Sequence, residues 1–171
     1  MCCIIYKPQG VQMPSLNILD KIKRVNNHGF GFMATNGMQS RKYKTMSYDR
    51  LLAQLKKVKT DEDCIIHMRY ATHGSKCTAN CHPFEENGVY FAHNGVLNIN
   101  PIEDMTDSET AFKTILYPCI EAYGIDFIKV RDVIAKMIGS SKFAFICNQR
   151  VRLFGRYEIL NGVYYSNLRW L

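Results

Sequence analysis

The chain opens with MCCIIYKPQG at residues 1–10, and this stretch can be interpreted in two ways. Two cysteines follow Met1, and a short apolar run follows them. Such a run predicts a short, fully buried β-strand. Taken alone, it is most economically a core strand with two incidental thiols. The other interpretation is that Cys2 becomes the first residue when Met1 is removed, so that one residue carries both a thiol nucleophile and an α-amine base.

The rest of the chain predicts an α+β fold in which helices stack on antiparallel sheet. The Asn36-Gly37 pair between two strand-like runs is a strong hairpin signal. We expect a polar loop from residue 73 to residue 88 and a break or kink at Pro118 in the third helix. Apolar periodicity predicts helices over 15–25, 47–59, 108–124 and 126–139, and strands over 2–6, 29–35, 38–46, 64–72, 89–96, 142–147, 151–155 and 162–167.

The composition predicts one globular domain over residues 1–171, without a membrane segment. The N-terminus lacks a basic region followed by a long apolar stretch, so we expect no signal peptide and a cytoplasmic protein. The net charge of +7 could steer the protein toward nucleic acid, but the basic residues are scattered, which favours an ordinary lysine-rich surface.

The chain has seven cysteines, an odd count, and a cytosolic compartment keeps thiols reduced. Cys77, Cys81 and His82 form a C-x3-C-H pattern. This pattern has no second half at zinc-finger spacing, so we expect neither a closed metal site nor a cofactor.

Polar clusters interrupt the apolar segments at four places: Cys2, HMRYATHG (67–74), AHNG (92–95) and TDSE (106–109). We place Arg69 inside the strand that begins at residue 64, where a buried guanidinium needs an anionic partner or ligand. A structural salt bridge is the simpler explanation for a single arginine. The functional alternative is a fork for a carboxylate, with Thr72 and His73 adding hydrogen bonds.

Two further clusters have a structural and a functional interpretation. Asn94-Gly95 is most simply a hairpin turn, but a side-chain amide beside a backbone N–H can also form an oxyanion hole. Asp107 fits a helix N-cap, but it can also serve as the counter-charge of an ammonium group. Arg69 and Asp107 together would then hold the two ends of a free amino acid.

Taken jointly, these clusters resemble the class II glutamine amidotransferases of the N-terminal nucleophile (Ntn) hydrolase superfamily. The resemblance covers most of the chain and departs from the family pattern at Cys3, where glycine is usual, and at His28, where Asp is common. The matching elements, in order, are Cys2, NNHGFGFMA (26–34), HMRYATHG, NCHPF (80–84), AHNGVLN (92–98) and TDSE.

The resemblance implies a four-layer αββα sandwich with two antiparallel sheets between helical layers. It implies that Cys2 is the nucleophile with its α-amine as base, and that Asn94 and the Gly95 N–H form the oxyanion hole. Glutamine would be held by Arg69, Thr72, His73 and Asp107, under a mobile lid over 73–83.

The implied reaction releases glutamate and ammonia from glutamine through a γ-glutamyl thioester on cysteine. No acceptor domain is recognisable within the 171 residues, so we expect the ammonia acceptor on a separate synthetase chain. Two alternatives stay open: a hydrolase of other γ-glutamyl amides or peptides, and a non-catalytic binding or regulatory protein on the same fold. The net charge is the only support for a third possibility, an amidotransferase subunit that serves nucleotide or nucleic-acid modification. The sequence predicts no particular oligomeric state.

Overall fold

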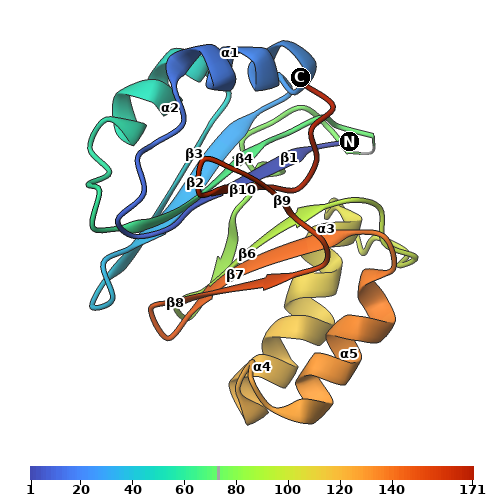
Figure 1. Cartoon of the computed structure of the whole chain (residues 1–171). Helices are drawn as coiled ribbons and strands as arrows, with labels where there is room; N and C mark the ends of the chain where they lie inside the picture. The colour runs from blue at the N-terminus through green and yellow to red at the C-terminus, as the bar shows by residue number, and fades with distance from the viewer. Residues whose placement is uncertain (73) are drawn as a thin grey trace.

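Two antiparallel β-sheets face each other in the computed structural model, and helices cover both outer surfaces (Figure 1). The structure describes residues 1–72 and 74–171. The order of layers is therefore helix, sheet, sheet, helix, as the resemblance implied. Among the described residues, no helix is both long and apolar enough to cross a bilayer.

The larger sheet has six strands and carries the N-terminal strand at an inner position. Helices α1 (Leu16–Val25) and α2 (Tyr48–Leu55) cover it, and the side chains of Ser15 and Ser47 cap their N-termini. Leu19 and Ile22 of α1 are buried against the sheet. In strand order the sheet runs β3 (Ser40–Thr45), β2 (Phe30–Thr35), β4 (Asp63–Met68), β1 (Cys3–Lys7), β10 (Val163–Tyr165), β9 (Glu158–Leu160).

The smaller sheet has four strands, in the order β5 (Phe84–Glu86), β6 (Val89–Asn94), β7 (Lys142–Cys147), β8 (Arg150–Phe154). Helix α5 (Ile128–Ile138) and the run α3 (Asp107–Ala111), η1 (Phe112–Leu116) and α4 (Tyr117–Tyr123) cover it. The segment η1 is a π-helix that ends two residues before Pro118. Because proline has no N–H to donate to the carbonyl four residues earlier, this wider turn accommodates Pro118 without ending the helix.

A third apolar cluster fills the space between the sheets, with side chains from β1, β2, β4, β6 and β7. Ile4 belongs to this inner cluster, whereas Cys3 and Ile5 pack under the helices α1 and α2. Alternate residues of a strand point to opposite faces. Cys3 is therefore a core residue on the face of β1 opposite that of Ile4.

Several predicted boundaries are wrong. Strand β4 ends at Met68, so Arg69 follows the strand rather than lying within it. The expected loop of 73–88 contains β5, which pairs with β6, and β9 was not predicted at all. Both missed strands are three residues long, too short to show an alternating pattern. Leu16 and Val25, the first and last residues of α1, are 57% and 44% exposed.

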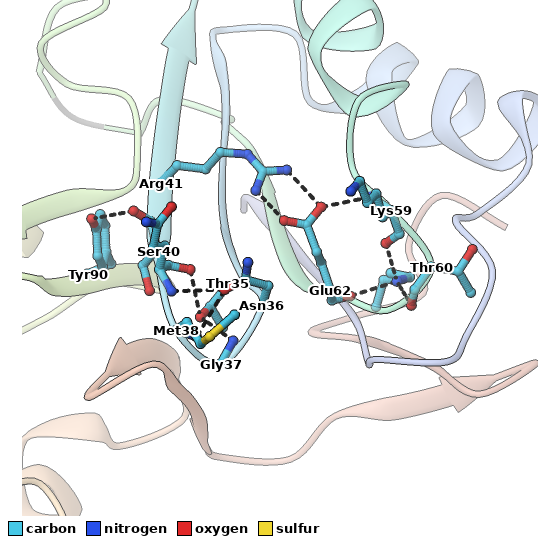
Figure 2. Close-up of polar contacts among 12 residues, drawn as sticks. Thr35, Asn36, Gly37, Met38, Ser40, Arg41, Lys59, Thr60, Glu62 and Tyr90 are labelled. Carbon is cyan, nitrogen blue, oxygen red and sulfur yellow. Dashed lines mark hydrogen bonds and ion pairs between the residues drawn. The ribbon is translucent and has the colours of Figure 1, made fainter.

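The predicted hairpin at Asn36-Gly37 joins β2 and β3 (Figure 2). The Asn36 Oδ1 atom accepts hydrogen bonds from the backbone N–H groups of Met38 and Gln39, and Gly37 has a φ of 85°. Figure 2 also shows Arg41 of β3 paired with Glu62, whose Oε2 atom accepts the Lys59 N–H at 2.8 Å. This ion pair fixes the chain just before β4.

Candidate active site

A narrow cavity of about 30 Å³ lies at the end of the sheets where β1 begins and β6 ends. This volume is enough for about one or two water molecules. Five of the seven predicted site residues line it: Cys2, Arg69, Thr72, Gly95 and Asp107. The sixth, Asn94, is buried but is not among the lining residues, and the seventh, His73, lies outside the described residues.

Cys2 stands one residue before β1, and its thiol contacts the backbone of Tyr70. The Tyr70 N–H donates to Sγ at 3.4 Å, and Sγ lies 3.5 Å from the Tyr70 carbonyl oxygen. Burial raises the pKa of the Cys2 thiol, and the backbone hydrogen bond to Tyr70 only partly opposes this. The neutral thiol therefore predominates at neutral pH, and a nearby base is needed for nucleophilic attack.

The backbone around Cys2 is held by two asparagine side chains. The Asn26 amide donates to the carbonyl oxygen of Met1 at 2.8 Å, and the Asn167 amide donates to the carbonyl oxygen of Cys2 at 2.9 Å. Asn26 begins the glycine-containing stretch 26–34 and is buried. These contacts hold the carbonyl groups on both sides of the Cys2 Cα atom.

Arg69 is buried, with 4% of its surface exposed, and it extends the pairing of β4 by backbone hydrogen bonds to residues 28 and 29. Its Nη1 atom donates to the carbonyl oxygen of Ser75 at 2.8 Å, and the Asn80 amide donates to the same oxygen at 3.0 Å. The segment 74–83 therefore folds over the guanidinium. Thr72 lines the cavity beside it and is exposed.

Asn94-Gly95 does not form a hairpin turn. The next element after β6 is the helix α3, and Gly95 has a φ of 149°. A side chain on Gly95 would come within 2.0 Å of Ser141 Oγ, so no larger residue fits without displacement. The Gly95 N–H makes no hydrogen bond to another of the described residues, so it is an available donor at the cavity wall.

Asp107 is not the N-cap of α3. The cap is Thr106, whose hydroxyl accepts the Glu109 N–H at 3.2 Å, and Asp107 is the first helical residue. The Asp107 carboxylate accepts the N–H groups of Leu97 and Ser108 at 2.9 and 2.8 Å. These bonds tie the loop after β6 to α3 and hold the carboxylate at the cavity.

Three buried histidines at the site were not predicted. His82 and His93 line the cavity, and His67 packs against His82 with ring centroids 4.2 Å apart. Burial lowers the pKa of His67 to about 3 and that of His93 to about 4, and it lowers the pKa of His82 as well. The imidazoles are therefore neutral at neutral pH. The quoted motifs contain all three histidines, but their spacing does not indicate that they come together.

A model of the class II glutamine amidotransferase family matches residues 24–142, more than half of the chain. The chain belongs to this family. The match includes the segments that carry Arg69, Asn94-Gly95 and Asp107, but it begins after Cys2. A comparison with curated proteins gave no significant match.

Two solved structures support the glutamine amidotransferase fold. The glutamine phosphoribosylpyrophosphate amidotransferase of B. subtilis, complexed with ADP and GMP, is 18% identical with a TM-score of 0.63. A structure described as the allosteric regulatory enzyme of purine biosynthesis is 19% identical with a TM-score of 0.62. Each alignment covers 96% of this chain and 41% of the other, so this chain spans about two fifths of their length. At these identities the likeness concerns the fold alone.

Proposed function

We propose that this protein hydrolyses the side-chain amide of glutamine to glutamate and ammonia, with Cys2 as nucleophile after removal of Met1. One observation carries the proposal: a single cavity is lined by a thiol, a guanidinium, a carboxylate and a free backbone N–H from four separate segments. These are the groups needed to attack an amide, stabilise its oxyanion and hold a free amino acid at both ends.

The first half of the reaction forms a thioester. The α-amine of Cys2 takes the thiol proton, and Sγ attacks the side-chain carbonyl carbon of glutamine. The negative charge that develops on the oxygen is stabilised by the Gly95 N–H and the Asn94 amide. When the intermediate collapses, the carbon–nitrogen bond breaks and the protonated amine returns its proton, so ammonia leaves and a γ-glutamyl thioester remains.

The second half regenerates the enzyme. The α-amine takes a proton from water, and the resulting hydroxide attacks the thioester carbon. The carbon–sulfur bond breaks, glutamate leaves, and the proton returns to the thiolate. Because the free α-amine has a pKa of about 7.7–8.0, it suits both roles near neutral pH.

The α-groups of glutamine are recognised by opposite charges in this proposal. The substrate carboxylate replaces the Ser75 carbonyl oxygen as the acceptor of the Arg69 Nη1 atom, and Thr72 and His73 assist. Asp107 faces the α-ammonium. Since the cavity is narrow, glutamine enters only when the segment 74–83 moves away from Arg69. This requirement supports a lid role for the segment.

The ammonia acceptor lies outside residues 1–171 in this proposal, on a partner synthetase. The described residues form one four-layer unit, and in this proposal the cavity of that unit binds glutamine. Ammonia release that rises when a candidate synthetase and its acceptor are added supports this part of the proposal. Unchanged release with every candidate synthetase contradicts it.

The test is glutamate release from glutamine by the wild type, Cys2→Ala and Cys119→Ala. Cys119 lies on α4, away from the cavity, so its variant controls for the loss of a thiol. We expect Cys2→Ala to lose about 10³-fold or more in rate and Cys119→Ala to stay near the wild type. Equal activity of the wild type and Cys2→Ala overturns the mechanism. Activity on γ-glutamyl peptides without activity on glutamine overturns the substrate.

A further inference from the structure

Ser166 joins β1, the strand that follows Cys2, to the end of β6 in the smaller sheet. It directly follows β10, and its backbone N–H donates to the Ile4 carbonyl oxygen at 2.9 Å. Its hydroxyl oxygen accepts the Ile4 N–H at 2.8 Å, so Ser166 is fixed to β1 two residues beyond Cys2. The residue is buried, with 3% of its surface exposed.

The same hydroxyl contacts Asn94 across the gap between the sheets. The Asn94 Nδ2 atom lies 2.8 Å from Ser166 Oγ. Asn94 shares the face of β6 with Ala92, which belongs to the cluster between the sheets, and Cys2 shares the face of β1 with Ile4 of that cluster. One serine hydroxyl therefore connects the strand behind the nucleophile to the amide expected to stabilise the oxyanion.

The hydrogen-bond capacity of these groups indicates which way the amide must face during catalysis. With Nδ2 toward Ser166, the serine oxygen accepts two N–H groups, while Asn94 Oδ1 is buried without a partner among the described residues. A hydroxyl also carries one proton to donate, and the neighbouring Cys3 sulfur is only a weak acceptor. A half-turn of the amide lets Ser166 donate to Oδ1 and leaves Nδ2 free to donate.

We propose that Ser166 is a positioning residue that holds Asn94 by donating to Oδ1, so that Nδ2 is presented to the oxyanion of the tetrahedral intermediate. The inference rests on the proposed glutaminase function and adds to it the residue that orients the oxyanion hole. The next residue, Asn167, holds the Cys2 carbonyl oxygen at 2.9 Å. The turn after β10 thus fixes the nucleophile and the oxyanion donor relative to each other.

The first experiment compares the steady-state kinetics of glutamine hydrolysis by the wild type, Ser166→Ala and Ser40→Ala. Ser40 is a matched control, because its hydroxyl is also buried but has no hydrogen-bond partner among the described residues. We expect Ser166→Ala to lower kcat about 10- to 100-fold with little change in KM. Removal of one oxyanion donor lowers kcat by about 10²–10³-fold, and in this variant the donor is misplaced rather than removed. Ser166→Thr, which keeps the hydroxyl, restores most of kcat.

Two further measurements separate positioning from a merely structural role. In the Asn94→Ala background, Ser166→Ala causes no further loss of kcat, because its effect passes through the missing amide. Alkylation of Cys2 by iodoacetamide, a reaction that forms no oxyanion, proceeds at the wild-type rate in Ser166→Ala. A full additional loss in the double variant, or a parallel fall in alkylation, overturns the inference.

The outcome for the wild type distinguishes this inference from the proposed function. If the wild type releases no glutamate from glutamine, the proposed function fails. If the wild type is active and Ser166→Ala has an equal kcat, the proposed function stands and the positioning role is wrong.

Discussion

At the scale of single residues, the two N-terminal cysteines have different environments because a strand alternates its faces. Cys3 packs under the helices, whereas Cys2 lines the cavity. Both thiols have a pKa raised by burial, to about 12 for Cys3. The proposed difference between them is therefore not intrinsic acidity but the α-amine that Cys2 gains on loss of Met1.

Asp107→Asn tests the ammonium site at this scale. The amide keeps the size of the side chain but removes the negative charge that we propose faces the α-ammonium. We expect KM for glutamine to rise about 10- to 100-fold, with a smaller effect on kcat, because the interaction is made in the ground state and in the transition state alike. Steady-state glutaminase kinetics measure this, and thermal unfolding controls for folding. A fall in kcat at unchanged KM contradicts the assignment.

At the scale of elements, sequence patterns identified the helices and the longer strands, including β2 and β3 on either side of the Asn36-Gly37 hairpin. The helical spacing of apolar residues such as Leu19 and Ile22 predicts directly that these side chains are buried. The three-residue strands β5 and β9 were missed because they depend on pairing with β6 and β10, which no local pattern encodes. For the same reason the sequence indicated the individual motifs of the site but not Ser166, which reaches it from the opposite end of the chain.

The strands β4 and β6 and the segment before β5 bring three neutral histidines into the interior, and this makes stability depend on pH. The pKa values of His67 and His93 fall from an ordinary 6.5 to about 3 and about 4, and that of His82 also falls. The unfolded chain therefore binds more protons than the folded chain below pH 6.5, so the free energy of unfolding decreases as the pH falls.

We expect His67 and His93 each to lower the free energy of unfolding by about 2 kcal/mol between pH 7 and pH 5, and His82 to act in the same direction. Urea unfolding at the two pH values measures the effect. His82→Leu replaces one imidazole with an apolar side chain and should reduce the difference between the two pH values. Equal stability at pH 7 and pH 5 would show that the buried imidazoles are solvated or paired in the folded protein.

At the scale of the whole molecule, the two sheets make an apolar contact along their faces and open into the cavity at one end. The N-terminal strand and the end of β6 lie there in different sheets, and Ser75 of the segment 74–83 accepts a hydrogen bond from Arg69 at the same cavity. Stacking the sheets thus brings Cys2 and the Asn94-Gly95 pair to one end of the sheets, where we propose that they act as nucleophile and oxyanion donors.

Hydrogen exchange tests the lid at this scale. Saturation with glutamate, the product, should slow exchange of the amides in 74–83, because the loop closes on a bound α-carboxylate. The helices α4 and α5 serve as an internal control and should not change. Unaltered exchange in the loop at a glutamate concentration that saturates the protein contradicts the lid role.

The most direct test of the central claim is peptide mass spectrometry of the protein after reaction with a diazoketone analogue of glutamine, which alkylates a nucleophile in a glutamine site. We predict an N-terminal peptide that begins at Cys2 and carries one adduct on that residue, with labelling prevented by excess glutamine. A peptide that retains Met1, or an adduct on a different cysteine, would contradict the account.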